Sequence, residues 1–144
     1  MLGRVSADAS ALTGVVDETL RYDSPVQNTR RWAALDVAVA GREVRQGEMV
    51  LVVLGAANRD PAANADPDRF DPWRTDRRSY TFGTGAHACP GASMAISIAA
   101  AGVGELIAAG VDLRRFGTPA RYRPSANVRM PEFAATAAAG EGNG

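Results

Sequence analysis

The sequence predicts an α+β fold with two main helices, a small mixed or antiparallel β-region and long ordered loops. Three observations predict this class. Apolar residues recur at helical spacing near the start of the chain, short apolar runs alternate with turn residues over positions 30–54, and an alanine-rich stretch at 92–110 follows a glycine-containing loop. The 144 residues suffice for one domain with a modest core.

The two helices are expected at residues 6–22 and 92–110. In the first, Leu12, Val16 and Leu20 recur every four residues, and Pro25 ends the helix because the residue before a proline avoids helical angles. The second consists mostly of alanine and glycine, whose side chains contribute little hydrophobicity. It therefore predicts a buried helix of a soluble protein rather than a membrane span.

The β-region is expected between the helices and after them. Residues 30–54 contain strands, and the continuous apolar run at 49–54 predicts a strand that is buried on both faces. A further ribbon is expected at 111–130, with turns near residues 117–119 and 124–125.

A meander rich in proline and aspartate is expected at residues 58–75. Its three Asp-Pro pairs preclude regular structure, but Phe70 and Trp73 can be buried and would hold it in one conformation. The domain is expected to span residues 1–133, and the alanine- and glycine-rich residues 134–144 to form a disordered tail.

Charge and composition exclude several function classes. Lysine plus arginine and aspartate plus glutamate both number 16, so the net charge is zero, which argues against nucleic-acid and polybasic membrane binding. With one cysteine and one histidine, the chain offers neither a disulfide nor a multi-cysteine metal framework. The N-terminus lacks the pattern of a signal peptide, so we expect the reducing cytoplasm.

The loop around the only cysteine is the most informative segment. A thiolate that ligates a haem iron must approach the macrocycle closely, which requires glycines in the adjacent backbone, and it is stabilised by backbone N–H groups and by the N-terminus of a following helix. Cys89 and Pro90 stand where the second helix begins. The candidate haem-contacting residues of this loop are Phe82, Gly83, Gly85, His87, Cys89 and Gly91.

This loop resembles the haem-binding signature of the cytochrome P450 family, of the bacterial soluble type. The signature has a phenylalanine, a glycine three residues later, a basic residue two before the cysteine and a glycine two after it, and the chain matches all of these positions. The resemblance implies a haem b whose axial ligand is the Cys89 thiolate, with Phe82 packed against the cysteine side of the ring and His87 hydrogen-bonded to a propionate.

Two plainer interpretations of the loop remain open. A lone cysteine in apolar surroundings is usually a packed, inert side chain. Residues 83–88 also fit the dinucleotide fingerprint G-x-G-x-x-A, although no apolar strand precedes them and Pro90 and Gly91 fall where an uninterrupted helix is required.

Glu18 and Arg21 lie three residues apart and therefore on one face of the first helix. Such a pair is commonly a weak surface ion pair. The pair also resembles the family's E-x-x-R motif, and residues 67–70 resemble its P-x-R-F element. The resemblance implies a buried network of Glu18, Arg21 and Arg69 that fixes the core beside the haem.

Two weaker resemblances complete the match, which extends from about residue 12 to residue 133. Residues 58–61 are similar to a stretch common in bacterial members of the family. Arg31, or Arg30 if the register differs by one, resembles an arginine that pairs with a haem propionate, whereas a solvated surface charge is the plainer interpretation. After the cysteine loop, residues 93–96 depart from the family's Leu-Ala-Arg.

Family members are much longer than this chain, so the resemblance implies a C-terminal region whose N-terminal half is absent. That half would include the central helix with the acid–threonine pair for oxygen activation. The implied function is a monooxygenase that inserts one oxygen atom into a small apolar organic substrate, with electrons from a ferredoxin-like donor. We expect the isolated chain to be inactive. A non-catalytic haem-binding module and, less well supported, a dinucleotide-binding domain are the alternatives.

Overall fold

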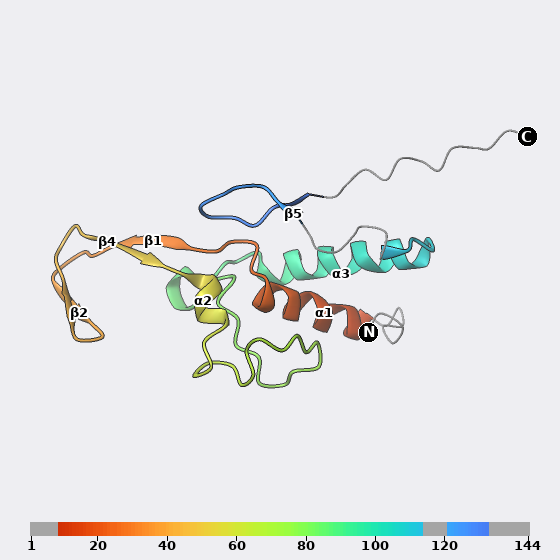
Figure 1. Cartoon of the computed structure of the whole chain (residues 1–144), viewed down its shortest axis with the longest axis horizontal. Helices are drawn as coiled ribbons and strands as arrows, with labels where there is room; N and C mark the ends of the chain where they lie inside the picture. The colour runs from red at the N-terminus through yellow and green to blue at the C-terminus, as the bar shows by residue number, and fades with distance from the viewer. Residues whose placement is uncertain (1–8, 114–120, 133–144) are drawn as a thin grey trace, which may run out of the picture.

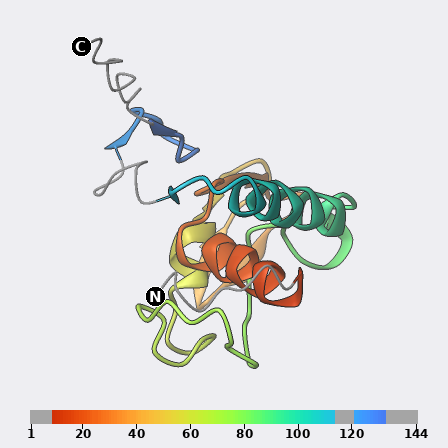
Figure 2. The same ribbon diagram turned by 90° about the vertical axis from the view of Figure 1, so that its right-hand side faces the viewer.

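The computed structural model describes residues 9–113 and 121–132. Helix α1 (Ala9–Tyr22) and helix α3 (Ala92–Ala108) lie side by side, as both views of the ribbon show (Figures 1 and 2). Both predicted helices are confirmed in this part of the chain. The expected tail at 134–144 and the expected turn at 117–119 lie outside the described residues.

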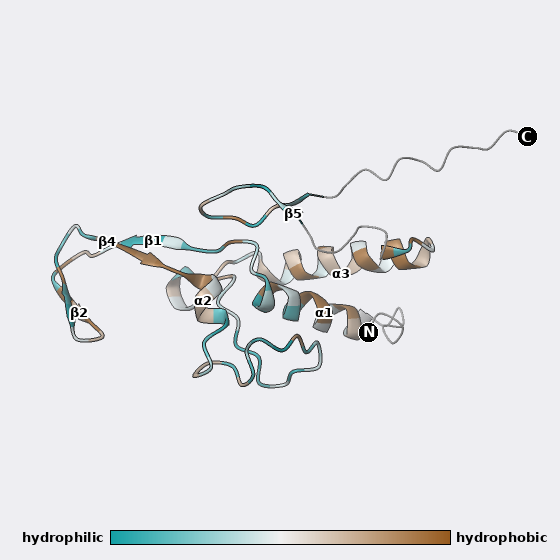
Figure 3. Ribbon diagram, in the orientation of Figure 1, coloured by the Kyte–Doolittle hydropathy of each residue, from teal (hydrophilic) through white to brown (hydrophobic). Residues whose placement is uncertain are grey.

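The apolar core lies between these two helices. Its buried members are Leu12 and Val16 of α1 and Ala100 of α3. The hydropathy colouring shows apolar segments on both helices, while the meander is largely hydrophilic (Figure 3). Small residues allow close contacts around α1, because a Cβ atom at Gly14 would lie only 2.7 Å from the Pro72 carbonyl oxygen. Leu20, Ile96, Val103 and Ile107 pack around this core.

The described strands form three antiparallel pairs of two strands each. They are β1 (Thr29–Trp32) with β4 (Met49–Val52), β2 (Val37–Val39) with β3 (Arg42–Val44), and β5 (Arg121–Tyr122) with β6 (Pro131–Glu132). In the first pair Thr29 lies opposite Val52 and Trp32 opposite Met49. The predicted ribbon near the C-terminus is thus confirmed for its described residues.

Two expectations about burial were wrong. Strand β4 is not buried on both faces, since Met49 is 53% exposed and Leu51 is 49% exposed. Helix α3 is not buried either, because Met94 and Ile98 are 68% and 66% exposed. Both predictions assumed that apolar segments are covered on all sides, and the described residues supply a cover on one side only. Within residues 9–113 and 121–132, no helix is long and apolar enough to span a membrane.

The apolar run also ends earlier than expected, because the chain turns into a short helix, α2 (Leu54–Asn58). After it, residues 59–84 contain no strand and no helix, as the prolines predicted. Phe70 packs edge-on against Tyr22, with ring centroids 5.5 Å apart. Trp73, in contrast, is 57% exposed, so the expectation that it anchors the meander was wrong.

Candidate functional site

A concave site of about 780 Å³ lies beside the loop that carries Cys89. Its lining is mostly apolar and comes from the end of α1, the segment after it, β1, β4, α2, the cysteine loop and α3. Segments far apart in the sequence therefore meet at one cavity, whose size is within the range of about 300–1,000 Å³ that is typical of ligand sites. Five of the residues singled out in the sequence line it, namely Arg31, Phe82, Gly83, His87 and Cys89.

Backbone hydrogen bonds fold the cysteine loop tightly. The Cys89 N–H donates to the Phe82 carbonyl oxygen (2.7 Å), and the Gly83 N–H donates to the Tyr80 carbonyl oxygen (2.9 Å). Gly83 has a φ of +70°, and a Cβ atom there would lie 2.8 Å from the His87 carbonyl oxygen. Position 83 therefore requires glycine for both its dihedral angle and its space.

Cys89 is a free, exposed thiol that stands just before α3. The Ala92 N–H donates to the Cys89 carbonyl oxygen (3.3 Å), and Gly91 is the residue from which the helix starts. Gly85 has a φ of +61° and begins η2 (Gly85–His87), a single 3₁₀ turn. Gly85 and Gly91 are not among the residues that line the cavity, so they shape the loop around the cysteine.

The structure distinguishes the two candidate arginines of strand β1. Arg31 lines the cavity, whereas Arg30 does not. The two are neighbours on one strand, and their side chains therefore point to opposite faces of it. The Arg31 guanidinium donates to the Thr29 hydroxyl (3.0 Å) and to the Arg30 carbonyl oxygen (2.8 Å).

Glu18 and Arg21 form a fully buried ion pair rather than a surface one. Both side chains are 0% exposed. The Arg21 Nε and Nη2 atoms donate to the two carboxylate oxygens at 3.0 and 2.7 Å, which is the bidentate geometry. The Arg77 Nε atom donates to Oε2 (3.0 Å), the Asp71 N–H donates to Oε1 (2.9 Å), and the Arg74 Nε atom lies 3.7 Å from Oε1.

These contacts control the ionisation of Glu18. Burial alone would raise the pKa of its carboxyl group, but the hydrogen bonds from Arg21, the Asp71 backbone and Arg77 outweigh this effect and lower the pKa from an ordinary value of 4.5 to about 2. Arg21 also donates to the backbone carbonyl oxygens of Asn58 (3.0 Å) and Pro67 (2.8 Å). The charged group thereby fastens the meander to α1.

The expected role of the Arg69 side chain was wrong. Its guanidinium group is 70% exposed and lies 3.5 Å from the Asp71 carboxylate, away from Glu18. Only its backbone carbonyl oxygen takes part, as an acceptor for Arg21 (3.2 Å). The second and third cations near Glu18 are instead Arg77 and Arg74, whose side chains are 15% and 6% exposed.

Asn58 is a buried polar residue whose structural role the sequence analysis did not identify. It is 0% exposed, and its amide group donates to the hydroxyls of Ser24 (2.6 Å) and Thr81 (2.9 Å). Its side-chain oxygen accepts from the Tyr80 N–H (2.6 Å). Asn58 thus connects α2, the end of α1 and the start of the cysteine loop. The signal was present only as the resemblance of residues 58–61 to a family stretch.

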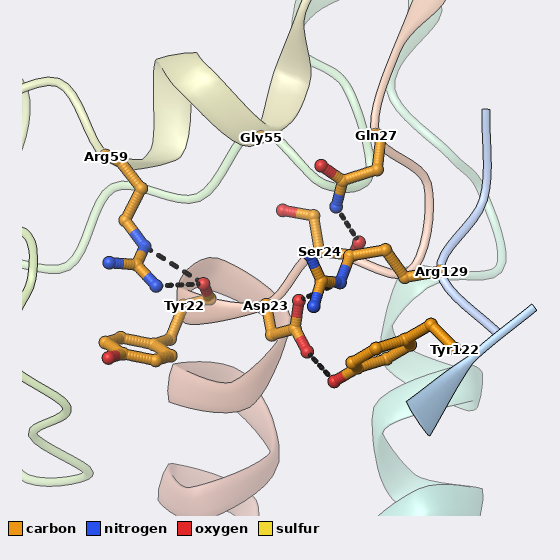
Figure 4. A pocket seen from close by; sticks show the side chains of 8 residues that line it. All are labelled: Tyr22, Asp23, Ser24, Gln27, Gly55, Arg59, Tyr122 and Arg129. Carbon is orange, nitrogen blue, oxygen red and sulfur yellow. Dashed lines mark hydrogen bonds and ion pairs between the residues drawn. The ribbon is translucent and has the colours of Figure 1, made fainter. Parts of the chain in front are cut away.

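A second pocket of about 430 Å³ lies at the end of α1 (Figure 4). Asp23 lies between Tyr122 and Arg129 there and contacts both. The Arg129 guanidinium stacks 4.0 Å from the centroid of the Tyr122 ring. A hydrogen bond with the Tyr122 side chain and the negative charge of Asp23 raise the pKa of Arg129 above its ordinary value. Burial acts in the opposite direction but does not offset them. At the same pocket, the Arg59 guanidinium lies over the Tyr22 ring, 3.6 Å from the ring centroid.

Comparison with known proteins assigns the chain to a family. The sequence model of the cytochrome P450 family matches residues 7–108. The biotin biosynthesis cytochrome P450 of Bacillus subtilis is 41% identical over 117 residues, which are 81% of this chain and 30% of that protein. The 6-deoxyerythronolide B hydroxylase of Saccharopolyspora erythraea is 46% identical over 94 residues, 65% of this chain and 23% of that protein. The chain belongs to the cytochrome P450 family.

Solved structures have the same fold. P450BioI, in complex with an acyl carrier protein ligated to hexadec-9Z-enoic acid, superposes with a TM-score of 0.82 at 37% identity, over 91% of this chain and 34% of that one. CYP164A2 of Mycobacterium smegmatis with econazole gives a TM-score of 0.79 at 38% identity, over 88% and 32%. The chain thus spans about a third of the length of these relatives. Proteins of this family hold a haem through a cysteine thiolate.

The competing dinucleotide fingerprint lacks its structural context. Such a site requires a strand that leads into the glycine turn and belongs to a parallel sheet. Residues 59–84 contain no strand, and the strand pairs of the described residues are all antiparallel. The glycines at 83 and 85 instead serve the tight loop before the cysteine.

Proposed function

We propose that this chain is the C-terminal, haem-binding region of a cytochrome P450 monooxygenase and that Cys89 is the axial ligand of its iron. The observation that carries the proposal is the meeting of Cys89, Phe82, Gly83, His87 and Arg31 at one largely apolar cavity. The cavity has the lining that a haem requires, with one thiol, two basic side chains and a mostly apolar wall.

Each residue of the loop has a proposed role toward the haem. The Cys89 sulfur would bind the iron, and the partial positive charge at the start of α3 is favourable for an anionic sulfur. Phe82 would pack on the cysteine side of the ring, and His87 and Arg31 would pair with the propionates. Gly83, Gly85 and Gly91 would let the backbone approach the macrocycle.

The chemistry follows from that ligand. A haem with an axial thiolate supplies electron density that favours O–O cleavage. The chain's own residues hold the sulfur at the ring, neutralise the propionates and line the cavity with apolar side chains that exclude water. We further propose a small apolar organic substrate, a ferredoxin-like electron donor and a cytoplasmic location, where a reducing environment keeps the single thiol free.

We propose that the 144 residues alone bind haem but do not turn over substrate. Among the helices of residues 9–113 and 121–132, none is a counterpart of the central helix with its acid–threonine pair, which the resemblance implies for oxygen activation. Apolar side chains also remain exposed on α3 and on β1, where Trp32 is 64% exposed. An N-terminal half of the family fold would cover them, in the same polypeptide or in a separate one.

The proposal is tested by titrating the purified chain with haem and following absorbance. We expect saturation at one haem per chain, and much weaker binding for Cys89→Ala. The matched control is Ser93→Ala, at an exposed small residue in the first turn of α3 that is not part of the cavity lining. Binding of a dinucleotide that Cys89→Ala leaves unchanged would overturn the proposal.

Turnover is tested separately. Substrate oxidation by the isolated chain would contradict the claim of inactivity. If the completed fold, supplied with electron donors, also fails to oxidise substrate, a non-catalytic haem module is favoured.

A further inference from the structure

Two segments from opposite ends of the chain join at the edge of the cavity. Residues 25–28, which follow α1, run antiparallel to residues 126–129 of the C-terminal ribbon, with Val26 opposite Val128. The Gln27 N–H donates to the Asn127 carbonyl oxygen (2.7 Å), and the Arg129 N–H donates to the Pro25 carbonyl oxygen (2.8 Å). Pro25 and Val26 themselves line the cavity, so this junction forms part of its wall.

Asp23 fastens this junction from the α1 side (Figure 4). Its Oδ2 atom accepts a hydrogen bond from the Tyr122 hydroxyl (2.6 Å), and its Oδ1 atom lies 2.6 Å from the Arg129 Nε atom. Both oxygens of one carboxylate thereby hold both sides of the ribbon. We call this group of Asp23, Tyr122 and Arg129 the carboxylate clasp.

Hydrogen bonds hold the wall on the clasp side: the Gly55 N–H donates to the Gln27 carbonyl oxygen (3.1 Å), and the Asn28 side-chain amide donates to the Ala126 carbonyl oxygen (2.7 Å). The pocket of about 430 Å³ at the end of α1 is lined by Gln27 and by all three members of the clasp, so apolar packing does not hold the segment there. A segment with few packed contacts opens easily when its hydrogen bonds are weakened. The clasp therefore adds a charged contact between the end of α1 and the ribbon to the hydrogen bonds that hold residues 25–28 beside the cavity.

We infer that Asp23 is a positioning residue for the haem cavity: it holds the ribbon against residues 25–28 and so keeps the Pro25–Val26 wall in place. This inference rests on the proposed haem site. Asp23 touches neither the cavity nor the cysteine loop, and its effect is transmitted through Tyr122, Arg129 and the backbone pairing.

The test compares the full chain with Asp23→Asn, a substitution of nearly equal size that removes the charge. Because Asp23 and Arg129 are partly exposed, we expect a moderate effect: amide hydrogen exchange at Gln27 and Arg129 rises about fivefold. Exchange at Val16 in the core between α1 and α3 stays unchanged. With haem bound, its dissociation rate also rises about fivefold, while the Soret band of the reduced carbon-monoxide complex keeps its position.

Two further variants make the outcome decisive. Asp23→Glu keeps the carboxylate and should restore slow exchange and slow haem loss. Asp36→Asn removes the same charge from the β2–β3 region, which contributes nothing to the cavity lining, and should change neither rate. Unchanged exchange at Gln27 in Asp23→Asn, or faster exchange with unchanged haem loss, would overturn the inference. Absence of any thiolate-type Soret band in the unaltered chain would instead overturn the proposed haem site.

Discussion

Removing the charge of Glu18 should be the most damaging single change outside the cysteine loop. In Glu18→Gln the buried guanidinium of Arg21 loses its bidentate partner, and Arg77 and Arg74 lose their nearest carboxylate. Breaking a buried ion pair by removing one partner costs about 3–5 kcal/mol. The difference between the ordinary pKa of 4.5 and the folded value of about 2 independently corresponds to about 3 kcal/mol.

A loss of this size is a large fraction of the whole stability of a small domain, which is about 5–15 kcal/mol. Urea unfolding followed by circular dichroism, from wild type and Glu18→Gln at pH 7, measures the difference directly. Asp68→Asn is the matched control, because its carboxylate is 85% exposed and pairs with Arg59 at the surface. It should cost at most about 1 kcal/mol. A loss below about 1 kcal/mol for Glu18→Gln would refute the argument that the buried pair holds the meander.

The pH dependence of the same difference gives a second check. The pKa of Glu18 is lower in the folded chain than in the unfolded chain, so its stabilising effect is complete above about pH 4.5 and is lost as the pH falls through about 2. The stability gap between wild type and Glu18→Gln should therefore be constant from pH 7 to pH 5 and narrow below that. A gap that widens on acidification would contradict the sign of this linkage.

Four further substitutions test other parts of the account by urea unfolding. Gly83→Ala should cost about 1–2 kcal/mol for its positive φ alone, and a neutral effect would show that the loop does not need glycine. Asn58→Ala should cost about 1–3 kcal/mol, because it leaves the partly buried Tyr80 N–H without its acceptor; a loss under about 0.5 kcal/mol would argue against that role. Arg77→Ala should destabilise the chain more than Arg69→Ala, whose change in unfolding free energy should stay within about 0.5 kcal/mol. The reverse order would show that the Arg69 side chain, and not Arg77, stabilises Glu18.

The helices and the lack of regular structure in the meander could be predicted because local chemistry decides them. Leu12 and Val16 recur at helical spacing and do form the core with Ala100. Prolines in the meander exclude regular structure wherever it packs. The five-residue helix α2 was missed because alanine and glycine carry no periodic signal and the preceding apolar run suggested a continuing strand.

Burial could not be predicted in the same way. Met49 and Met94 are apolar, and their exposure depends on which layer covers them, which is a property of distant parts of the chain. The sequence also could not decide which arginine approaches Glu18, because Arg69, Arg74 and Arg77 lie within nine residues of irregular backbone. Their order of approach depends on the turns of the meander.

The cysteine loop was the most predictable part of the candidate site. Of the six residues predicted in this loop, four line the cavity together with Arg31, namely Phe82, Gly83, His87 and Cys89. The carboxylate clasp left no such signal, since Asp23 and Arg129 are 106 positions apart and form no motif. Contacts of this kind become visible only when the chain is folded.

The central claim is that the sulfur of Cys89 binds a haem iron. The most direct measurement is the absorbance spectrum of the reduced, haem-loaded chain under carbon monoxide, beside that of Cys89→Ser. The account predicts a red-shifted Soret band of thiolate type in the unaltered chain and its loss in the variant. An unshifted band in the unaltered chain, or an identical shifted band in both, would contradict it.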